Sequence, residues 1–314
     1  MAAPLYPSVT NTYHHDQYPA IDPNRPELDC SGKVIVITGG GRGIGKAIVL
    51  AFAKAHAKGI GLIGRTQSTL DATAAEMKEL NAGTDVFVCT ADIVLPEQVG
   101  QAMNSIIEHF GGVPDVLVNN AGGLSGVGSL TDVDLDDIWS AFDINVRGPL
   151  AVTQAYLRAN KKHSPDTART VINISSGAAH LPYAPGLAAY STSKLANAKI
   201  MEYLHHENPS WNVFNMQPGV VATDLASQAG RKAPDTPELP AGFAVWLATQ
   251  PEARILNGRF VWANWDVTEL VAMKEELSRR SLLTLTLKGW ADDMNEEELK
   301  RRALSVNRDV GKKG

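Results

Sequence analysis

Tyr190 and Lys194 are the two residues of this sequence whose types and spacing best suit acid–base chemistry. Four residues apart on a helix, their side chains project from the same face, so the phenol and the ammonium can converge on one point. A phenol has a reference pKa of about 10, and a neighbouring cation brings that pKa toward the neutral range. The pattern specifies only two positions in five and arises often by chance, so its meaning depends on the surrounding scaffold.

The scaffold begins at Lys33, where short apolar runs start to alternate with longer segments of helical spacing. Seven β-branched, nearly continuous runs are typical of strands buried on both faces of a parallel sheet: Lys33–Thr38, Ile60–Gly64, Val86–Thr90, Asp115–Asn119, Thr170–Ser175, Trp211–Gln217 and Arg259–Ala263. Apolar residues at three- and four-residue spacing predict helices over Ile44–His56, Leu70–Leu80, Glu97–Phe110, Val146–Ala159 and Ala189–His206. We therefore expect an α/β fold, a Rossmann-like, doubly wound, seven-stranded parallel sheet.

No linker divides the chain before about residue 265, so a single catalytic domain is expected over residues 29–266. Residues 1–28 are rich in Pro, Tyr, His, Asp and Asn without a period, which predicts an extended or partly disordered arm. Residues 267–314 form a C-terminal helical extension with amphipathic stretches at Thr268–Arg280 and Asn295–Leu304. This extension could cover the site, support a dimer or cap the core.

One irregular segment, Ser227–Pro240, interrupts the alternation with Gly, Lys, Arg, acids and three prolines. Its composition predicts a loop, and its position after the sixth strand makes it a candidate lid over a site at that edge of the sheet.

Composition excludes several classes of function. The net charge of -5 argues against a general nucleic-acid or anionic-membrane binder, which usually carries a basic excess. No apolar run approaches the roughly 20 residues of a membrane span, and no signal peptide is evident, so a cytoplasmic protein is expected. Cys30 and Cys89 fit neither a disulfide framework nor a metal-ligand set. The run His14-His15-Asp16 has no further Cys/His cluster to complete a metal site, so no metal is expected.

A glycine-rich segment follows the first predicted strand directly. Residues 38–45 read T-G-G-G-R-G-I-G and open into a helix. Gly39, Gly43 and Gly45 allow a tight turn and close backbone approach, and the helix N-terminus supplies unpaired N–H groups. Strand before and helix after is the context of a dinucleotide pyrophosphate site.

The second strand indicates which nicotinamide dinucleotide is bound. NAD-binding folds place an acid near its end to hold the ribose 2′-OH, whereas NADP needs a cation there. Here the strand ends at Gly64 and Arg65 follows. Arg42, inside the glycine loop, is a second guanidinium that could reach the same 2′-phosphate. The sequence therefore favours NADP (NADPH).

From about Gly32 to about Leu270 the chain resembles the classical short-chain dehydrogenase/reductase (SDR) family. Seven elements stand in the family's order: the T-G-x-x-x-G-x-G loop at 38–45, Asp92 followed by Ile93, Asn119-Asn120-Ala121-Gly122, Asn145, Ser175-Ser176, Tyr190 with Lys194, and Pro218-Gly219 leading to Thr223. The resemblance implies an oxidoreductase of the alcohol/carbonyl type (EC 1.1.1) that uses NAD(P).

The resemblance also assigns the cofactor contacts. It implies that the glycine loop including Ile44 binds the pyrophosphate and that Asp92 with Ile93 binds the adenine. The segment containing Asn119, Ala121 and Gly122 would lie against the cofactor in a mostly architectural role, with asparagine tying neighbouring strands. The loop of Pro218, Gly219, Val221 and Thr223 would orient the nicotinamide carboxamide. Asp92 could instead serve as a turn acid, and Thr223 as a helix N-cap.

For the chemistry, the resemblance makes Tyr190 the general acid that protonates the oxygen of a reduced carbonyl, or the base in reverse. Lys194 would lower the pKa of the tyrosine and hold the ribose hydroxyls. Ser176 would donate to the substrate oxygen. Asn145 would retain a water that links the lysine to solvent.

Two departures from the family pattern stand out. Tyr190 lies fourteen residues after Ser176, one more than the family's usual gap. A one-residue insertion between Gly177 and Ala189 accommodates this difference, so Ser176 is the preferred catalytic serine, and Ser175, at fifteen residues, is the reserve candidate. The seventh strand carries Trp262 and Trp265 where many members have small residues. Together with the long tail, these tryptophans resemble fungal NADP-dependent reductases, including those of secondary metabolism. We expect six residues to line the substrate mouth: Leu124, His180, Leu181, Tyr183, Pro185 and Leu225.

These observations lead to an NADP(H)-dependent reductase of a ketone or aldehyde, with a sizeable apolar metabolite as its substrate. One alternative is an enzyme of the same fold that catalyses dehydration, isomerisation or cyclisation with bound NADP. Another is a cofactor-binding regulator that acts through a protein contact. The resemblance also implies a homodimer or homotetramer, paired through the helices at 146–159 and 189–206.

Overall fold

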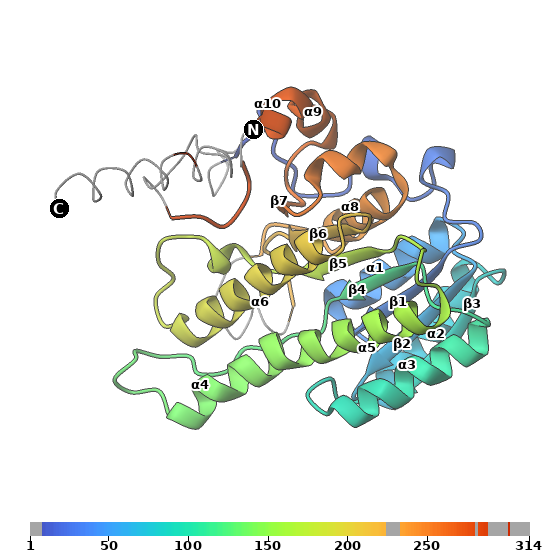
Figure 1. Cartoon of the computed structure of the whole chain (residues 1–314), viewed down its shortest axis with the longest axis horizontal. Helices are drawn as coiled ribbons and strands as arrows, with labels where there is room; N and C mark the ends of the chain where they lie inside the picture. The colour runs from blue at the N-terminus through green and yellow to red at the C-terminus, as the bar shows by residue number, and fades with distance from the viewer. Residues whose placement is uncertain (1–7, 224–232, 280–281, 288–300, 302–314) are drawn as a thin grey trace, which may run out of the picture.

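A computed structural model describes residues 8–223, 233–279, 282–287 and 301. It shows a parallel sheet between two layers of helices (Figure 1). The seven strands lie in the order β3-β2-β1-β4-β5-β6-β7, and every neighbouring pair is parallel. The predicted Rossmann-like, doubly wound fold is confirmed.

Each strand begins and ends within one residue of its predicted run. The strands are β1 (Val34–Thr38), β2 (Gly59–Gly64), β3 (Asp85–Thr90), β4 (Val116–Asn119), β5 (Thr170–Ile174), β6 (Asn212–Gln217) and β7 (Phe260–Trp262). All residues of β1, β4 and β5 are buried, because helices cover both faces of the central sheet. Strand order reverses between β1 and β4, which is where ligands bind in open α/β sheets.

The helices divide between the two faces of the sheet. Their bounds are α1 (Gly43–Lys54), α2 (Gln67–Leu80), α3 (Pro96–Phe110), α4 (Leu135–Phe142), α5 (Gly148–His163), α6 (Ala188–Glu207), α8 (Glu238–Thr249), α9 (Val267–Ala272) and α10 (Lys274–Arg279). Side chains of α1, α2 and α8 join one buried cluster, and those of α3 and α5 join another. Helix α6 contributes Ala198 to the first cluster and Met201 and Leu204 to the second. In β1, Ile35 and Ile37 enter the first cluster and Val36 the second, as alternation along a strand requires.

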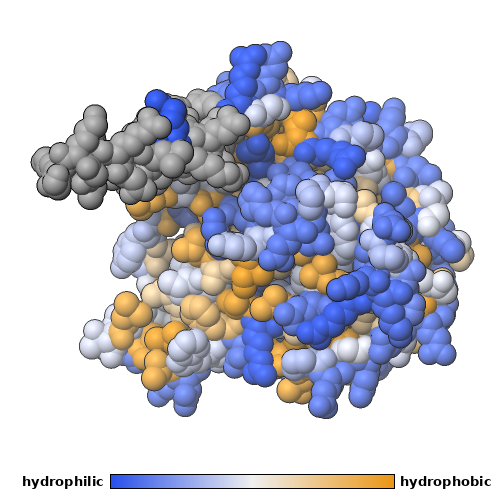
Figure 2. All heavy atoms as spheres, viewed as in Figure 1, coloured by the Kyte–Doolittle hydropathy of each residue, from blue (hydrophilic) through white to orange (hydrophobic). Residues whose placement is uncertain are grey.

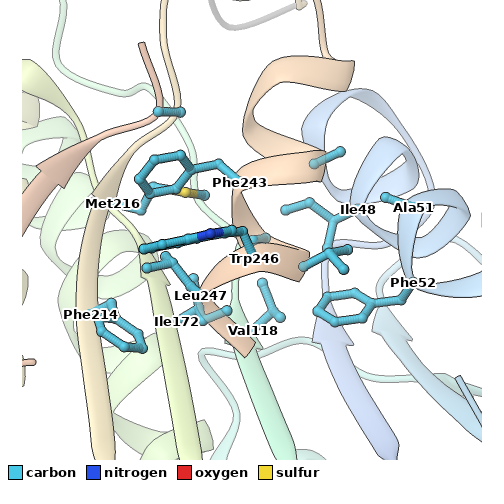
Figure 3. Close-up of a cluster of buried hydrophobic side chains, with 14 of the residues drawn as sticks. Ile48, Ala51, Phe52, Val118, Ile172, Phe214, Met216, Phe243, Trp246 and Leu247 are labelled. Atoms are coloured by element: carbon cyan, nitrogen blue, oxygen red, sulfur yellow. The ribbon is translucent and has the colours of Figure 1, made fainter. Parts of the chain in front are cut away.

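Helix α8 forms the centre of the first cluster. Figure 3 shows Phe243 and Trp246 of α8 over Ile172 and Met216 of the sheet, with Ile48 of α1 beside them. Most of α8 is buried, so it has no polar face and no amphipathic period. The sequence of α8 therefore lacks the spacing of apolar residues that predicts a helix.

A π-helical turn, Asp143–Arg147, joins α4 to α5. The predicted helix Val146–Ala159 therefore starts inside this turn, and the regular helix begins at Gly148. A π turn inserts a residue into the helical hydrogen-bond ladder and is frequent at functional sites. Here it carries Asn145, which is fully buried.

The described part of the N-terminal arm, residues 8–28, is not detached. It contains two short 3₁₀ turns, Pro19–Ile21 and Pro26–Leu28, and is otherwise extended or irregular. Ile21 and Leu28 are buried in the first cluster. The hydroxyl of Tyr18 donates to the carbonyl of Trp265 at 3.1 Å, which ties the arm (blue in Figure 1) to the end of the sheet.

The described part of the C-terminal extension is helical. The single helix predicted over Thr268–Arg280 is two short helices, α9 and α10, which meet at Met273. The predicted helix Asn295–Leu304 lies almost wholly outside the described residues. Residues 227–232 of the candidate lid also lie outside them. The described end of that loop stops at Pro237, because Glu238 begins α8.

Across the described residues, none of the helices has the length and apolarity needed to span a membrane.

Candidate active site

A cavity of about 710 Å³ opens at the carboxyl ends of the central strands. This volume lies within the range of small-molecule and cofactor sites. Its walls come from the glycine loop after β1, the ends of β2 to β6 and the start of α6. The sheet thus brings together at one edge the motifs that the sequence had placed at the ends of separate strands.

The backbone of the glycine loop requires its glycines. Gly39 and Gly43 have φ angles of 69° and 54°, a left-handed conformation that side chains disfavour. A Cβ atom on Gly45 would lie 2.2 Å from the carbonyl oxygen of Gly39. The side chain of Asn120 steadies the loop by donating to the carbonyls of Thr38 at 2.9 Å and Gly39 at 3.2 Å. The N-terminus of α1 opens beside this loop, so the cradle fits a dinucleotide pyrophosphate.

The residues predicted for the adenosine end lie together in the cavity lining. Arg42, Arg65, Asp92 and Ile93 all contribute to it, and Gly64 ends β2 without a side chain. Asp92 Oδ1 accepts a hydrogen bond from the N–H of Val94 at 3.1 Å, so its turn-forming role is present alongside its position at the cavity. Two further polar residues, Thr66 and Thr69, line this end and were not identified from the sequence.

Tyr190 and Lys194 lie on the cavity side of α6, as their spacing predicted. Lys194 Nζ is 5.9 Å from the centre of the Tyr190 ring, and it donates to the carbonyl of Ile174 at 3.0 Å. The lysine is 6% exposed, and burial lowers the pKa of its ammonium to about 8. A buried cation is costly unless it is paired, so this ammonium favours an anion or several acceptors beside it.

Both candidate serines follow β5 and border the cavity. Ser176 is half-buried and caps the 3₁₀ turn Gly177–Ala179, its Oγ accepting from the N–H of Ala178 at 3.2 Å. Ser175 is 3% exposed, and within the described residues its hydroxyl has no hydrogen-bond partner. Ser176 is therefore the more accessible of the two hydroxyls. Gln217, not identified from the sequence, orients the same turn by accepting from the N–H of Gly177 at 2.8 Å.

Asn145 lies behind the cavity wall instead of lining it. Its Nδ2 donates to the carbonyl of Gly123 at 2.9 Å and to Ser193 Oγ at 3.2 Å, and its Oδ1 accepts from the N–H of Gly123 at 3.1 Å. A Cβ atom on Gly122 would be 3.0 Å from Asn145 Oδ1 and 3.3 Å from Lys194 Nζ. The side-chain oxygen of Asn145 and the ammonium of Lys194 therefore both lie beside Gly122.

Asn119 is the predicted cofactor residue that the structure places away from the cavity. It is 2% exposed, and its Nδ2 donates to Thr153 Oγ1 in α5 at 2.8 Å. Successive side chains of a strand alternate between faces, so Asn119 is directed into a helix layer. Asn120, the next residue, lines the cavity together with Ala121 and Gly122.

The loop after β6 forms the wall beside the glycine loop. Pro218, Gly219, Val221 and Thr223 all line the cavity. A Cβ atom on Gly43 would lie 3.3 Å from Thr223 Cγ2, so the two loops are in close proximity. The N-cap role considered for Thr223 concerns the residues that follow it, and residues 224–232 lie outside the described part of the chain.

The predicted substrate mouth is only partly reproduced. Leu124, Leu181 and Tyr183 line the cavity, and Ile144 and Leu187 add apolar surface that the sequence did not indicate. Pro185 is not in the lining, and Leu225 lies outside the described residues. His180 turns away to β7, where its Nε2 accepts from Trp262 Nε1 at 3.0 Å.

Comparison with known proteins gives a consistent result. A family model described as short chain dehydrogenase matches residues 33–234. The chain is 35% identical to the short chain dehydrogenase pigC of Monascus ruber, over 86% of this chain and 90% of that protein. It is 34% identical to the short chain dehydrogenase/reductase AacuD of Aspergillus aculeatus, over 88% and 96%. A crystal structure of a short-chain type dehydrogenase/reductase from Mycobacterium marinum superposes with a TM-score of 0.68 at 27% identity, covering 75% of this chain and 95% of that one.

Proposed function

The chain belongs to the short chain dehydrogenase family, and on that premise we propose that it is an NADP(H)-dependent oxidoreductase that interconverts a ketone or aldehyde and an alcohol. The observation that carries the proposal is the position of Tyr190 and Lys194 in one cavity with Ser176 and the glycine loop. Proton donor, hydrogen-bond donor and dinucleotide cradle thus border a common space, as carbonyl reduction requires.

The chain's own residues account for the proton and the substrate oxygen. Bound NADPH supplies the hydride. Ser176 donates a hydrogen bond to the carbonyl oxygen and stabilises the negative charge that develops there. Tyr190 transfers its phenolic proton to that oxygen, and Lys194 stabilises the resulting phenolate. In the oxidation direction the phenolate removes the alcohol proton.

The choice of NADP over NAD rests on the charges at the adenosine end. Arg42 of the glycine loop and Arg65, which directly follows β2, both line the cavity, and Gly64 at the end of β2 offers no carboxylate to a ribose hydroxyl. Two guanidinium groups can bind a 2′-phosphate through charge-assisted hydrogen bonds. An NAD site would instead need an acid at this position.

The substrate is proposed to be a sizeable apolar carbonyl compound. Beyond Tyr190 the cavity continues to Leu124, Leu181 and Leu187, which offer apolar surface with Tyr183 at the rim. The relatives in Monascus and Aspergillus support a fungal setting, and we place the enzyme in secondary metabolism and in the cytoplasm.

Self-association is part of the proposal, as a homodimer or homotetramer paired along α5 and α6. Orange, hydrophobic surface is visible at the α4 end of this helix layer (Figure 2). Leu130, just before α4, and Leu135 and Trp139 within it are 72%, 64% and 60% exposed. An exposed apolar patch of this kind is typical of an interface. Light scattering after size-exclusion chromatography tests it, and a monomer at micromolar concentration would contradict it.

The function is tested with a panel of ketones and aldehydes, each assayed with NADPH and with NADH. We expect a loss of absorbance at 340 nm that matches the alcohol formed, with the lower KM for NADPH. Turnover of a substrate without change at 340 nm would favour dehydration, isomerisation or cyclisation instead. A lower KM for NADH would contradict the roles given to Arg42 and Arg65.

A further inference from the structure

A buried carboxylate lies directly behind the cavity wall formed by the loop after β6. The side chain of Asp235 is 2% exposed, and its Oδ2 accepts a hydrogen bond from the N–H of Val220 at 2.5 Å. The N–H of Asp235 in turn donates to the carbonyl of Val220 at 3.2 Å, and Val221 pairs with Asp235 as a parallel bridge. Burying a carboxylate is costly unless partners satisfy it, so these contacts hold the loop and Asp235 in one arrangement.

The conformation of the loop depends on this carboxylate. Gly219 has a φ angle of 93°, and a Cβ atom placed on it would lie 2.7 Å from Asp235 Oδ2. The carboxylate thus occupies the space that a side chain at position 219 would need. Because Pro218, Gly219, Val220 and Val221 all line the cavity, the position of Asp235 fixes the shape of this wall.

The second oxygen of Asp235 is held by the N-terminal arm. His15 Nδ1 contacts Asp235 Oδ1 at 2.5 Å. Next to it, the N–H of Thr236 donates to the carbonyl of His15 at 2.9 Å, and Thr236 Oγ1 donates to Asp16 Oδ1 at 2.5 Å. The arm and the described end of the candidate lid loop are therefore joined by backbone and side-chain bonds at adjacent residues.

The arm is itself anchored on the end of the sheet. Tyr13 forms an antiparallel bridge with Trp265, and the N–H of His14 donates to the carbonyl of Asn264 at 2.7 Å. The Nδ2 of Asn264 returns a hydrogen bond to the carbonyl of His14 at 2.9 Å. His15 consequently projects from a fixed segment that is attached to the core immediately beside it.

We propose that His15 and Asp235 are positioning residues for the cofactor: the N-terminal arm clamps, through this pair, the loop that forms the nicotinamide side of the cavity. Both residues lie outside residues 33–234, the range that the family model matches. The inference rests on the proposed function, because it assumes that the cavity binds NADP(H).

The test uses the full chain and measures NADPH affinity by fluorescence titration, with thermal unfolding recorded in parallel. His15→Phe keeps an aromatic ring but removes the hydrogen bond to Asp235. We expect it to weaken NADPH binding about tenfold, in line with the loss of one hydrogen bond to a charged group. Asp235→Ala should weaken binding at least as much, and Asp235→Asn less, because its amide oxygen can still accept from Val220.

His14→Phe is the matched control on the same arm. His14 stacks on Tyr18 and contacts Asp266 Oδ2 through Nε2 at 2.9 Å, away from the cavity wall. We expect His14→Phe to lower the melting temperature while NADPH affinity stays within about twofold of wild type, a margin well below one hydrogen bond. A merely structural arm would instead make both substitutions change affinity in proportion to their effect on stability.

Affinities of His15→Phe and Asp235→Asn equal to wild type would overturn the inference, even if Asp235→Ala proves insoluble. So would a His14→Phe protein that loses as much affinity as His15→Phe. In both cases the wild-type protein still binds NADPH and the proposed function stands. Wild-type protein that binds neither NADPH nor NADH would overturn the proposed function and this inference together.

Discussion

The indole Nε1 of Trp262 donates a 3.0 Å hydrogen bond to Nε2 of His180, which joins the last strand of the sheet to the turn that follows Ser176. The Trp262 ring also packs on this turn, since a Cβ atom on Gly177 would lie 3.2 Å from it. The two departures from the family pattern are therefore one structural unit: the longer segment between serine and tyrosine contains the histidine that the strand tryptophan binds.

Trp262→Phe should consequently disturb Ser176 more than the dinucleotide cradle. We expect kcat/KM for a carbonyl substrate to fall about tenfold, the cost of a lost hydrogen bond and its packing, with NADPH affinity unchanged. Trp265→Phe is the control, because Trp265 stacks on Trp262 but its indole nitrogen has no hydrogen-bond partner in the described part of the chain. Equal losses of activity in both variants would contradict this account.

The same bond predicts a pH dependence. Burial lowers the pKa of His180, and Nε2 accepts from Trp262 only while it is unprotonated. The pKa of His180 in the folded state lies below the ordinary histidine pKa of about 6.5. The stability contributed by neutral His180 is therefore fully present above pH 6.5 and is lost as pH falls through the lowered pKa. The difference in melting temperature between wild type and Trp262→Phe should shrink between pH 7.5 and 5. A constant difference would show that His180 does not control the bond.

The buried ammonium of Lys194 should lower the free energy of unfolding at neutral pH. A pKa near 8, against an ordinary 10.5, corresponds to roughly 3 kcal/mol for burying the charged form. Below pH 8 this cost is fully present, and it disappears as pH rises toward 10.5, because the unfolded chain then also loses the proton. Lys194→Met should therefore raise the free energy of unfolding at pH 7 by about 1 to 2 kcal/mol, net of the lost bond to Ile174.

Denaturant unfolding at pH 7 and at pH 9.5 checks this prediction. The gain from Lys194→Met should be smaller at the higher pH, and the exposed Lys78 of α2, changed to Met, should give no gain at either. A Lys194→Met protein less stable than wild type at pH 7 would mean that partners in the site already compensate the buried charge.

Arg42 and Arg65 should determine cofactor preference. Removing either guanidinium removes hydrogen bonds to a charged phosphate, so Arg42→Ala and Arg65→Ala should each raise KM for NADPH about 10- to 100-fold. KM for NADH, which has no 2′-phosphate, is the internal control and should change little. Parallel increases for both cofactors would assign the arginines to the shape of the loop and not to the 2′-phosphate.

The fold could be predicted from the sequence because its signals are local. Runs such as the one ending at Thr38 are buried on both faces, so their composition alone identifies them as strands. Helix α8 carries no such signal, since burial around Phe243 and Trp246 removes the periodicity that marks a helix. The π turn at Asn145 packs against α6 and has no sequence pattern of its own.

The candidate site was predictable where residues follow strand ends in the sheet. Tyr190, Lys194 and the glycine loop lie where spacing placed them. Asn119 lies away from the cavity while Asn120 lines it, because successive side chains of a strand lie on opposite faces. The contact between His15 and Asp235 joins residues 220 positions apart, so only the folded chain reveals it.

The central claim is that Tyr190 donates the proton as hydride reaches a carbonyl. It is tested most directly by single-turnover oxidation of bound NADPH at 340 nm, with wild type and Tyr190→Phe mixed with an accepted ketone. Tyr190→Phe should bind NADPH as wild type does but reduce the ketone about 10²- to 10⁴-fold more slowly, the usual contribution of a positioned general acid. Reduction by Tyr190→Phe at the wild-type rate would contradict the account.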